Sequence, residues 1–231
     1  MISNERVDIQ TKTKLILTIT ALLALIALLC IGSAEVVQPN DDFWYLDEAN
    51  VLSEATEGEI FFANQRLYDA CGAEIVVVAI DSTGNMAIDD YVYTLFNNWE
   101  IGGNTYRGML LLMAIEDDNY YVMPGTNMGN YFDSATIREM LDKYLEPSFS
   151  RKDYDQGTRL FFEAVYEKIA DDLNLNLSIA DAKADYEAFT RSSVQLQQEP
   201  HSTTVQTPYN YDYSAHIAHR GENLRFFSIL L

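Results

Sequence analysis

Two nearly continuous runs of apolar residues constrain the fold of this chain more than any other feature. Residues 73–80 read AEIVVVAI, and residues 108–115 read GMLLLMAI. Neither run alternates with polar residues as a half-exposed strand would, so each predicts a strand buried on both faces. A helical pattern over residues 87–98 lies between them. This order predicts two parallel strands joined by a helix, within a sheet that is covered on both faces.

Further elements extend this pair. Ser53 is a good helix N-cap, and Gly72 ends the apolar pattern that follows it. Residues 116–119 predict a tight turn into a third strand at 120–123, so the last two strands form a hairpin. Pro147 is expected to end a helix. Helices are predicted over residues 53–72, 87–98, 133–145 and 153–173. The fold class is therefore α/β, a three-layer α/β/α sandwich with a small mixed sheet.

The N-terminus carries a targeting or anchoring segment. The 17 residues from Leu15 to Ile31 hold no charge and follow Lys12 and Lys14. As a helix they span roughly 25 Å, slightly less than a bilayer core. One interpretation is an uncleaved transmembrane anchor; the other is a signal peptide cleaved near residues 32–34. Both place the following domain on the extracytoplasmic side, either tethered to the membrane or secreted.

Shifts in composition predict the domain boundaries. The leader with its apolar segment covers residues 1–34, a linker 35–42, the α/β domain 43–173, a helical extension 174–192 and a disordered tail 193–231. The tail is rich in Gln, Ser, Thr, Pro, His and Tyr and ends in FFSILL. Six apolar residues cannot span a bilayer. Whether they are the stub of a longer membrane helix is open.

The charge of the chain is concentrated in the α/β domain. Residues 35–173 hold 27 acidic and 8 basic residues and account for nearly all of the formal net charge of −20. Such a surface repels phosphate backbones, which argues against a nucleic-acid partner. It also repels anionic lipid headgroups. It attracts cations or a basic protein partner, although solubility alone is an alternative role for the charge.

Histidine and cysteine usage excludes several chemistries from the domain. All three histidines, His201, His216 and His219, lie in the tail. The domain has one cysteine, Cys71, and the other, Cys30, lies in the apolar leader. The domain therefore cannot build a Ser-His-Asp or Cys-His site, a Cys/His zinc site or a disulfide. No sequence pattern indicates an organic cofactor. A metal would need oxygen ligands, which favours calcium or magnesium.

Carboxylates follow two of the predicted strands. Asp81 and Ser82 come after the first strand, and Asp117 and Asp118 after the second. Ligands of open α/β sheets lie beyond the carboxyl ends of parallel strands, and Asp47, before the first helix, is expected near the same edge. Calcium suits a flexible oxygen site of this kind. The competing interpretation is ordinary solvated turn residues.

Three residues are candidates for other roles. Arg107 is expected in a loop near the same edge, as the one basic side chain there, which is little for a phosphate site. Asp81 is the best available aspartyl nucleophile if the site is a phosphatase. Trp99 marks either a binding surface or an aromatic side chain that packs at a helix end.

Three stretches, in this order and spacing, resemble the TPM domain family, named for a thylakoid lumen protein, a photosystem repair protein and a nematode receptor modulator. Residues 45–53 (YLDEANVLS) are similar to its opening V-x-D-x-A-x-x-L-S. Residues 99–102 (WEIG) with 108–112 (GMLLL) are similar to W-x-I-G and G-V-L-L-L. Residues 147–149 (PSF) with 153–157 (DYDQG) are similar to P-x-F and D-Y…G.

The resemblance implies a three-layer α/β sandwich, extracytoplasmic and membrane-tethered, with calcium binding and weak acid phosphatase activity associated with plant and bacterial relatives. One block departs from the family: residues 125–129 read GTNMG where it has G-x-G-L-E, so Gly129 replaces a glutamate. The leading hypothesis is a binding or accessory module for a protein partner in a membrane complex, with calcium as a structural or regulatory ligand. The alternative is a weak metal-assisted acid phosphatase.

Overall fold

A computed structural model of the chain describes residues 36–40 and 43–198. The chain divides into an N-terminal unit, Met1–Val37, and a second unit that begins at Gln38 and contains the α/β domain. The predicted anchor or signal segment, Leu15 to Ile31, lies outside the described residues, as does the tail from residue 199 on. Among the residues that are described, no helix is both long and apolar enough to cross a membrane.

The described strands form one mixed sheet in the order β1-β2-β3-β4. Their bounds are β1 (Tyr45–Asp47), β2 (Glu74–Ile80), β3 (Gly108–Ala114) and β4 (Asn119–Pro124). β1 and β3 both pair in parallel with β2, whereas β4 returns antiparallel to β3 in a hairpin. Every residue of β2 and β3 is buried. The prediction of two buried, parallel strands from the two apolar runs is confirmed.

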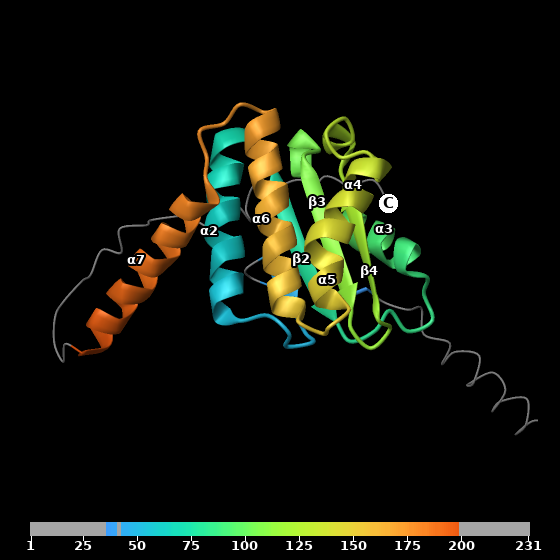
Figure 1. The fold of residues 1–231 in the computed structure, drawn as a ribbon, viewed down its shortest axis with the longest axis horizontal. Helices are drawn as coiled ribbons and strands as arrows, with labels where there is room; N and C mark the ends of the chain where they lie inside the picture. Colours follow the sequence, from blue (N-terminus) through green and yellow to red (C-terminus); the bar gives the residue numbers. More distant parts are fainter. Residues whose placement is uncertain (1–35, 41–42, 199–231) are drawn as a thin grey trace, which may run out of the picture. The chain divides into compact units, whose positions relative to one another are not determined.

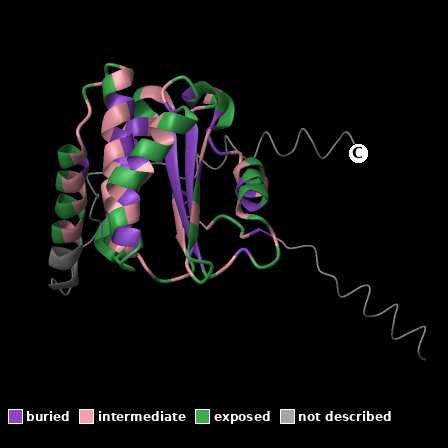
Figure 2. Cartoon of the chain, turned by 45° about the vertical axis from the view of Figure 1, so that its right-hand side comes forward, coloured by how far each residue is buried: buried purple, intermediate pink, exposed green. Residues whose placement is uncertain are grey.

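Helices cover both faces of this sheet. They are α2 (Glu54–Cys71), α3 (Ile88–Asn98), α4 (Ser134–Met140), the π-helix η3 (Leu141–Leu145), α5 (Glu146–Phe149), α6 (Tyr154–Asp172) and α7 (Ile179–Gln198), with short 3₁₀ turns η1 (Gly103–Thr105) and η2 (Thr126–Met128). α2, α6 and the α4–α5 segment lie on one face, and α3 lies on the other (Figure 1). Figure 2 shows the buried strands between these layers.

The ends of α2 follow from two residues. The Ser53 hydroxyl accepts a hydrogen bond from the Thr56 amide at 3.2 Å, as an N-cap does. Gly72 has a φ of 67°, a left-handed conformation that ends the helix, and its amide donates to the Tyr68 carbonyl. Both predicted boundaries of this helix are confirmed.

The first strand, β1, was not predicted, because it is only three residues long. It pairs with residues 77–79 of β2, so Ile75, near the start of β2, pairs with β3 on one side but has no strand on the β1 side. The Asn64 side chain of α2 takes that place: its Oδ1 accepts from the Ile75 amide at 2.7 Å, and its Nδ2 donates to the Ile75 carbonyl at 2.8 Å. The same Nδ2 lies 3.0 Å from the Ile60 carbonyl. A buried side-chain amide therefore takes the place of a pairing strand just before β1 begins.

The prediction that Pro147 ends the helix before it is wrong. α4, η3 and α5 follow one another without a break as far as Phe149. Proline normally disrupts a helix because it lacks an amide hydrogen and its ring crowds the carbonyl of residue i−4. Just before Pro147 the helix is a π-helix, in which the Glu146 amide bonds to the Leu141 carbonyl. This wider turn shifts the carbonyls and accommodates the proline inside the helical segment.

The helical extension predicted over residues 174–192 is a separate helix rather than a continuation of α6. Asn174, which has a φ of 52°, lies between the two helices. α7 packs mainly against α2 and reaches Gln198, so its last residues fall in the stretch predicted as tail. Tyr186 of α7 lies over Gly58 of α2, where a β-carbon would come within 2.2 Å of the tyrosine ring. Glycine at this position thus lets the two helices approach closely.

Candidate functional site

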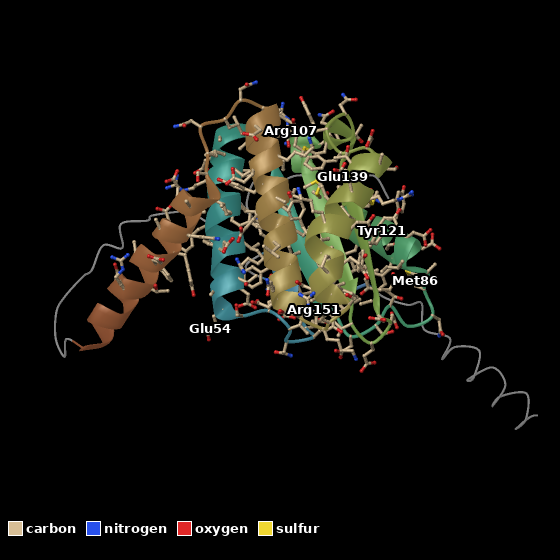
Figure 3. All side chains as sticks on the ribbon, viewed as in Figure 1. Glu54, Met86, Arg107, Tyr121, Glu139 and Arg151 are labelled. Carbon is tan, nitrogen blue, oxygen red and sulfur yellow. The ribbon has the colours of Figure 1, made fainter. Side chains whose placement is uncertain are left out.

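Carboxylates gather at the edge of the sheet where the parallel strands end. We call the residues of the three loops there the acidic edge; they are Asp47, Glu48, Asp81, Glu116, Asp117 and Asp118. α2 and α3 run antiparallel to the strands and so begin at this edge. Figure 3 shows Glu54, at the start of α2, at this end of the domain and Arg107 at the opposite end.

Asp117 connects the loops after β2 and β3. Its Oδ1 accepts from the Ser82 hydroxyl at 2.7 Å, and its Oδ2 accepts from the Thr83 amide at 2.8 Å. These bonds, first that of the Thr83 amide and then that of the Ser82 hydroxyl, hold the pKa of Asp117 below its usual value. The Thr83 hydroxyl donates to the Met86 carbonyl at 2.8 Å. The two loops therefore meet at one edge, as neighbouring parallel strands require.

Asp47 stabilises the turn that leads into α2. Its Oδ1 accepts from the Val51 amide at 3.1 Å, and its Oδ2 accepts from the Leu52 amide at 2.7 Å. One residue further on, the Ser53 amide donates to the Asp155 carboxylate of α6 at 2.7 Å. The stretches YLDEANVLS and DYDQG are thus in direct contact, and their acidic side chains position the first turns of α2 and α6.

The four aspartates predicted as calcium ligands do not form a metal site as they are arranged. Asp47 and Asp117 use both carboxylate oxygens in the hydrogen bonds above, whereas Asp81 and Asp118 are exposed. Within the described ranges, no group of three or more His, Cys, Asp or Glu side chains could hold a metal ion. A calcium ion at this edge would have to replace existing hydrogen bonds, and calcium binding stays a prediction.

Arg107 lies at the opposite edge, so the expectation that it lies near the carboxylates is wrong. It precedes Gly108, which pairs with Glu74, the first residue of β2, whereas Asp81 follows the last. A residue before a parallel strand lies at the far end from the residues that follow its neighbour. The guanidinium donates to the Cys71 carbonyl at 2.9 Å, at the end of α2. The basic residue expected beside the acidic edge therefore cannot assist a phosphate there.

Trp99 is in the core. Its side chain is 2% exposed, and its ring centroid lies 5.8 Å from that of Phe43. Ser82 is half-buried and reaches Asp117, as described above. Ser82, which the sequence placed beside Asp81 and which was a binding candidate with Trp99 and Arg107, is at the acidic edge, whereas Trp99 supplies packing.

Sequence reasoning missed a buried carboxylate at the opposite edge. Glu74 is fully buried, and its side chain accepts hydrogen bonds from the Trp44 indole at 3.2 Å and from the Gly102 amide. Gly102 has a φ of 90°, and a β-carbon there would lie 2.6 Å from the Gly108 amide nitrogen. The one signal in the sequence is a single glutamate inside the run AEIVVVAI. Gly102, the last residue of the stretch WEIG, therefore has a structural role.

The TPM domain model matches residues 45–168, more than half of the chain. The chain belongs to the TPM domain family. This confirms the resemblance seen in the three sequence stretches, and it places α7 outside the matched residues. The TPM domain here therefore carries an additional helix, α7, after the part that the family model covers.

Solved structures resemble this TPM domain in fold. The solution structure of the N-terminal domain of a protein from P. gingivalis has 20% sequence identity and a TM-score of 0.55, and the match covers 62% of this chain and 98% of that one. For the BA42 protein from Bizionia argentinensis the identity is 17%, the TM-score 0.45, and the covered shares are 55% and 92%. No curated protein matches the chain.

Proposed function

We propose that this TPM domain is a binding module of a membrane protein complex. In this proposal, residues 15–31 hold the domain at the extracytoplasmic side of a membrane, and its acidic edge contacts a basic surface of a protein partner. The observation that carries the proposal is the concentration of carboxylates at one edge of the domain. Complementary charge of this kind speeds association and selects the partner more than it adds affinity.

The helices add to this concentration. Because α2, α3 and α6 begin at the acidic edge, the acidic residues of their first turns lie there too; they are Glu54, Glu57, Asp89, Asp90 and Asp155. The positive end of a helix dipole favours carboxylates at such positions. Arg151 lies at this end as well (Figure 3) and offsets part of the charge. The resulting surface favours a partner rich in Lys and Arg over an anionic ligand.

The charge of the acidic edge can be reduced without touching its hydrogen bonds. Asp81→Asn, Glu116→Gln and Asp118→Asn together change exposed side chains only. At low ionic strength we expect the association of this triple variant with its partner to weaken about tenfold. The measurement is recovery of the partner with the full-length protein from detergent-solubilised membranes of the host, over a range of salt concentrations.

A matched triple variant elsewhere controls for total charge. Asp69→Asn, Glu139→Gln and Glu187→Gln change three exposed residues on α2, α4 and α7, and partner recovery should match that of the wild type. Equal recovery with both triple variants would contradict the acidic edge as the contact surface.

Calcium binding by the acidic edge can be tested separately. If Asp81, Asp117 and Asp118 turn towards one ion, millimolar calcium should raise the melting temperature of the full-length protein in detergent, because a ligand that binds only the folded state stabilises it. Asp81→Asn should abolish the increase. Magnesium at the same concentration is the control for ionic strength, and an unchanged melting temperature with calcium would remove calcium from the proposal.

A further inference from the structure

A second cluster of charged groups lies between α2, α6 and α7, away from the acidic edge. Glu59 of α2 is 6% exposed, and its Oε1 is buried without a hydrogen-bond partner. Its Oε2 lies 3.7 Å from the Lys183 ammonium of α7. Lys183 donates a shorter bond, of 2.8 Å, to Glu163 of α6. Arg159 of α6 also contacts Glu163, at 3.0 Å.

Two carboxylates therefore compete for one lysine, and of the three side chains only Glu59 is buried from water. With both ionised, Lys183 pairs with Glu163 and leaves a buried oxygen of Glu59 unsatisfied, which is unfavourable. A proton on Glu59 removes this conflict, because the protonated carboxyl can donate a hydrogen bond to Glu163. Glu163 keeps its charge, which Lys183 and Arg159 balance.

The electrostatics place the proton on Glu59. Burial, followed by the negative charge of Glu163, raises the pKa of Glu59 to about 7. Burial also acts to raise the pKa of Glu163, but the hydrogen bond from Lys183 and its charge outweigh burial, and that pKa lies below its usual value. The groups that face Glu59 are Glu163 and Arg159 from α6 and Lys183 from α7.

We propose that Glu59, Glu163 and Lys183 form a proton-operated latch that holds α7 against α2 and α6. The latch is tight when Glu59 is protonated and loosens when Glu59 is ionised. Other contacts of α7 do not depend on this proton: Ala182 is fully buried, the ring of Tyr186 lies 6.2 Å from that of Phe62, and Arg66 pairs with Asp185. The latch therefore tunes the docking of α7.

The pH range of the latch follows from the direction of the shift. Glu59 has a pKa of about 7 with α7 docked, above the ordinary value of 4.5. The protonation of Glu59 therefore stabilises the docked α7 fully at a pH below 4.5, the ordinary pKa. This stabilisation is lost as the pH rises through about 7, the pKa of Glu59 with α7 docked. α7 is thus held most tightly in mildly acidic surroundings and progressively less tightly towards neutral and alkaline pH. Because α7 follows the residues matched by the family model, the latch controls an addition to the TPM domain.

Hydrogen exchange of the α7 amides tests the latch in the full-length protein in detergent. Glu59→Gln keeps the shape of the protonated side chain but cannot ionise. Comparing wild type and variant at the same pH cancels the intrinsic pH dependence of exchange. The α7 exchange rate of the wild type, divided by that of Glu59→Gln, is expected to rise about tenfold between pH 5.5 and pH 8.5. A ratio that stays constant over this range would overturn the proposal.

Two further variants separate the latch from general stability. Lys183→Met removes the ammonium group and keeps an apolar stem, and faster exchange of α7 than in the wild type is expected at both pH values. Glu187→Gln, on the exposed side of α7 beside Arg191, is the matched control and should leave the pH dependence unchanged. The amides of β2 and β3 report on the whole domain. If they follow pH as strongly as those of α7, the effect is global and the latch is refuted.

Discussion

Glu74→Ala is expected to destabilise the domain by about 3–5 kcal/mol. The fully buried Glu74 side chain accepts hydrogen bonds from the Trp44 indole and the Gly102 amide. Alanine would leave both donors buried without these acceptors and would open a cavity. Because Gly102 has a left-handed backbone packed against Gly108, its loop cannot easily turn towards another acceptor. Urea unfolding of the full-length protein in a mild detergent measures the loss.

Two variants separate the lost hydrogen bonds from the cavity. Glu74→Gln keeps most of the volume but retains only one acceptor oxygen, so we expect a loss between those of wild type and Glu74→Ala. Trp44→Phe removes the indole donor together with part of the buried ring, and a double-mutant cycle with Glu74→Gln separates the coupling between the two side chains from that loss of packing. A free energy of unfolding for Glu74→Ala within 1 kcal/mol of wild type would contradict the role given to this carboxylate.

Asn64→Leu is expected to lower the free energy of unfolding by about 2–4 kcal/mol. Leucine has nearly the same length but cannot pair with the Ile75 amide and carbonyl, which lie where β1 no longer covers β2. Both backbone groups would stay buried without their partners, because Asn64 and Ile75 are fully buried. The same urea titration measures the effect.

Asn97→Leu is the matched control for this substitution. Asn97 lies on the exposed side of α3 and donates to the carbonyl of Tyr93, one helical turn earlier, as Asn64 does to Ile60. Because water can satisfy the freed carbonyl, a change within about 0.5 kcal/mol is expected. Losses of similar size at both positions would mean that the helical turn, and not the contact with Ile75, accounts for the effect.

The strands and caps that depend on local patterns could be predicted from the sequence. Continuous apolar runs identified β2 and β3, and Ser53 and Gly72 bounded α2. β1 could not be recognised, because three residues are too few to show the alternation of apolar and polar residues that marks a strand. Pro147 misled because the π-helix that accommodates it has no simple sequence signal.

The candidate site was predictable only in part, for a physical reason. Neighbouring parallel strands bring the loops that follow them together, so the approach of Ser82 and Asp117 follows from chain order. Arg107 was misplaced because the loop before a strand lies at the other edge. The cluster around Glu59 depends on how α7 packs, and residues 59, 163 and 183 are far apart in the sequence.

The shortness of β1 has a consequence for how this protein behaves at high concentration. A strand with unpaired backbone groups is a template on which another chain can assemble, and this is a common start of aggregation. Just before the start of β1, the Asn64 amide occupies the hydrogen-bonding groups of Ile75. A side chain, unlike a strand, offers no new row of backbone groups to an incoming chain. A single residue, Asn64, therefore prevents another chain from pairing with this stretch of β2.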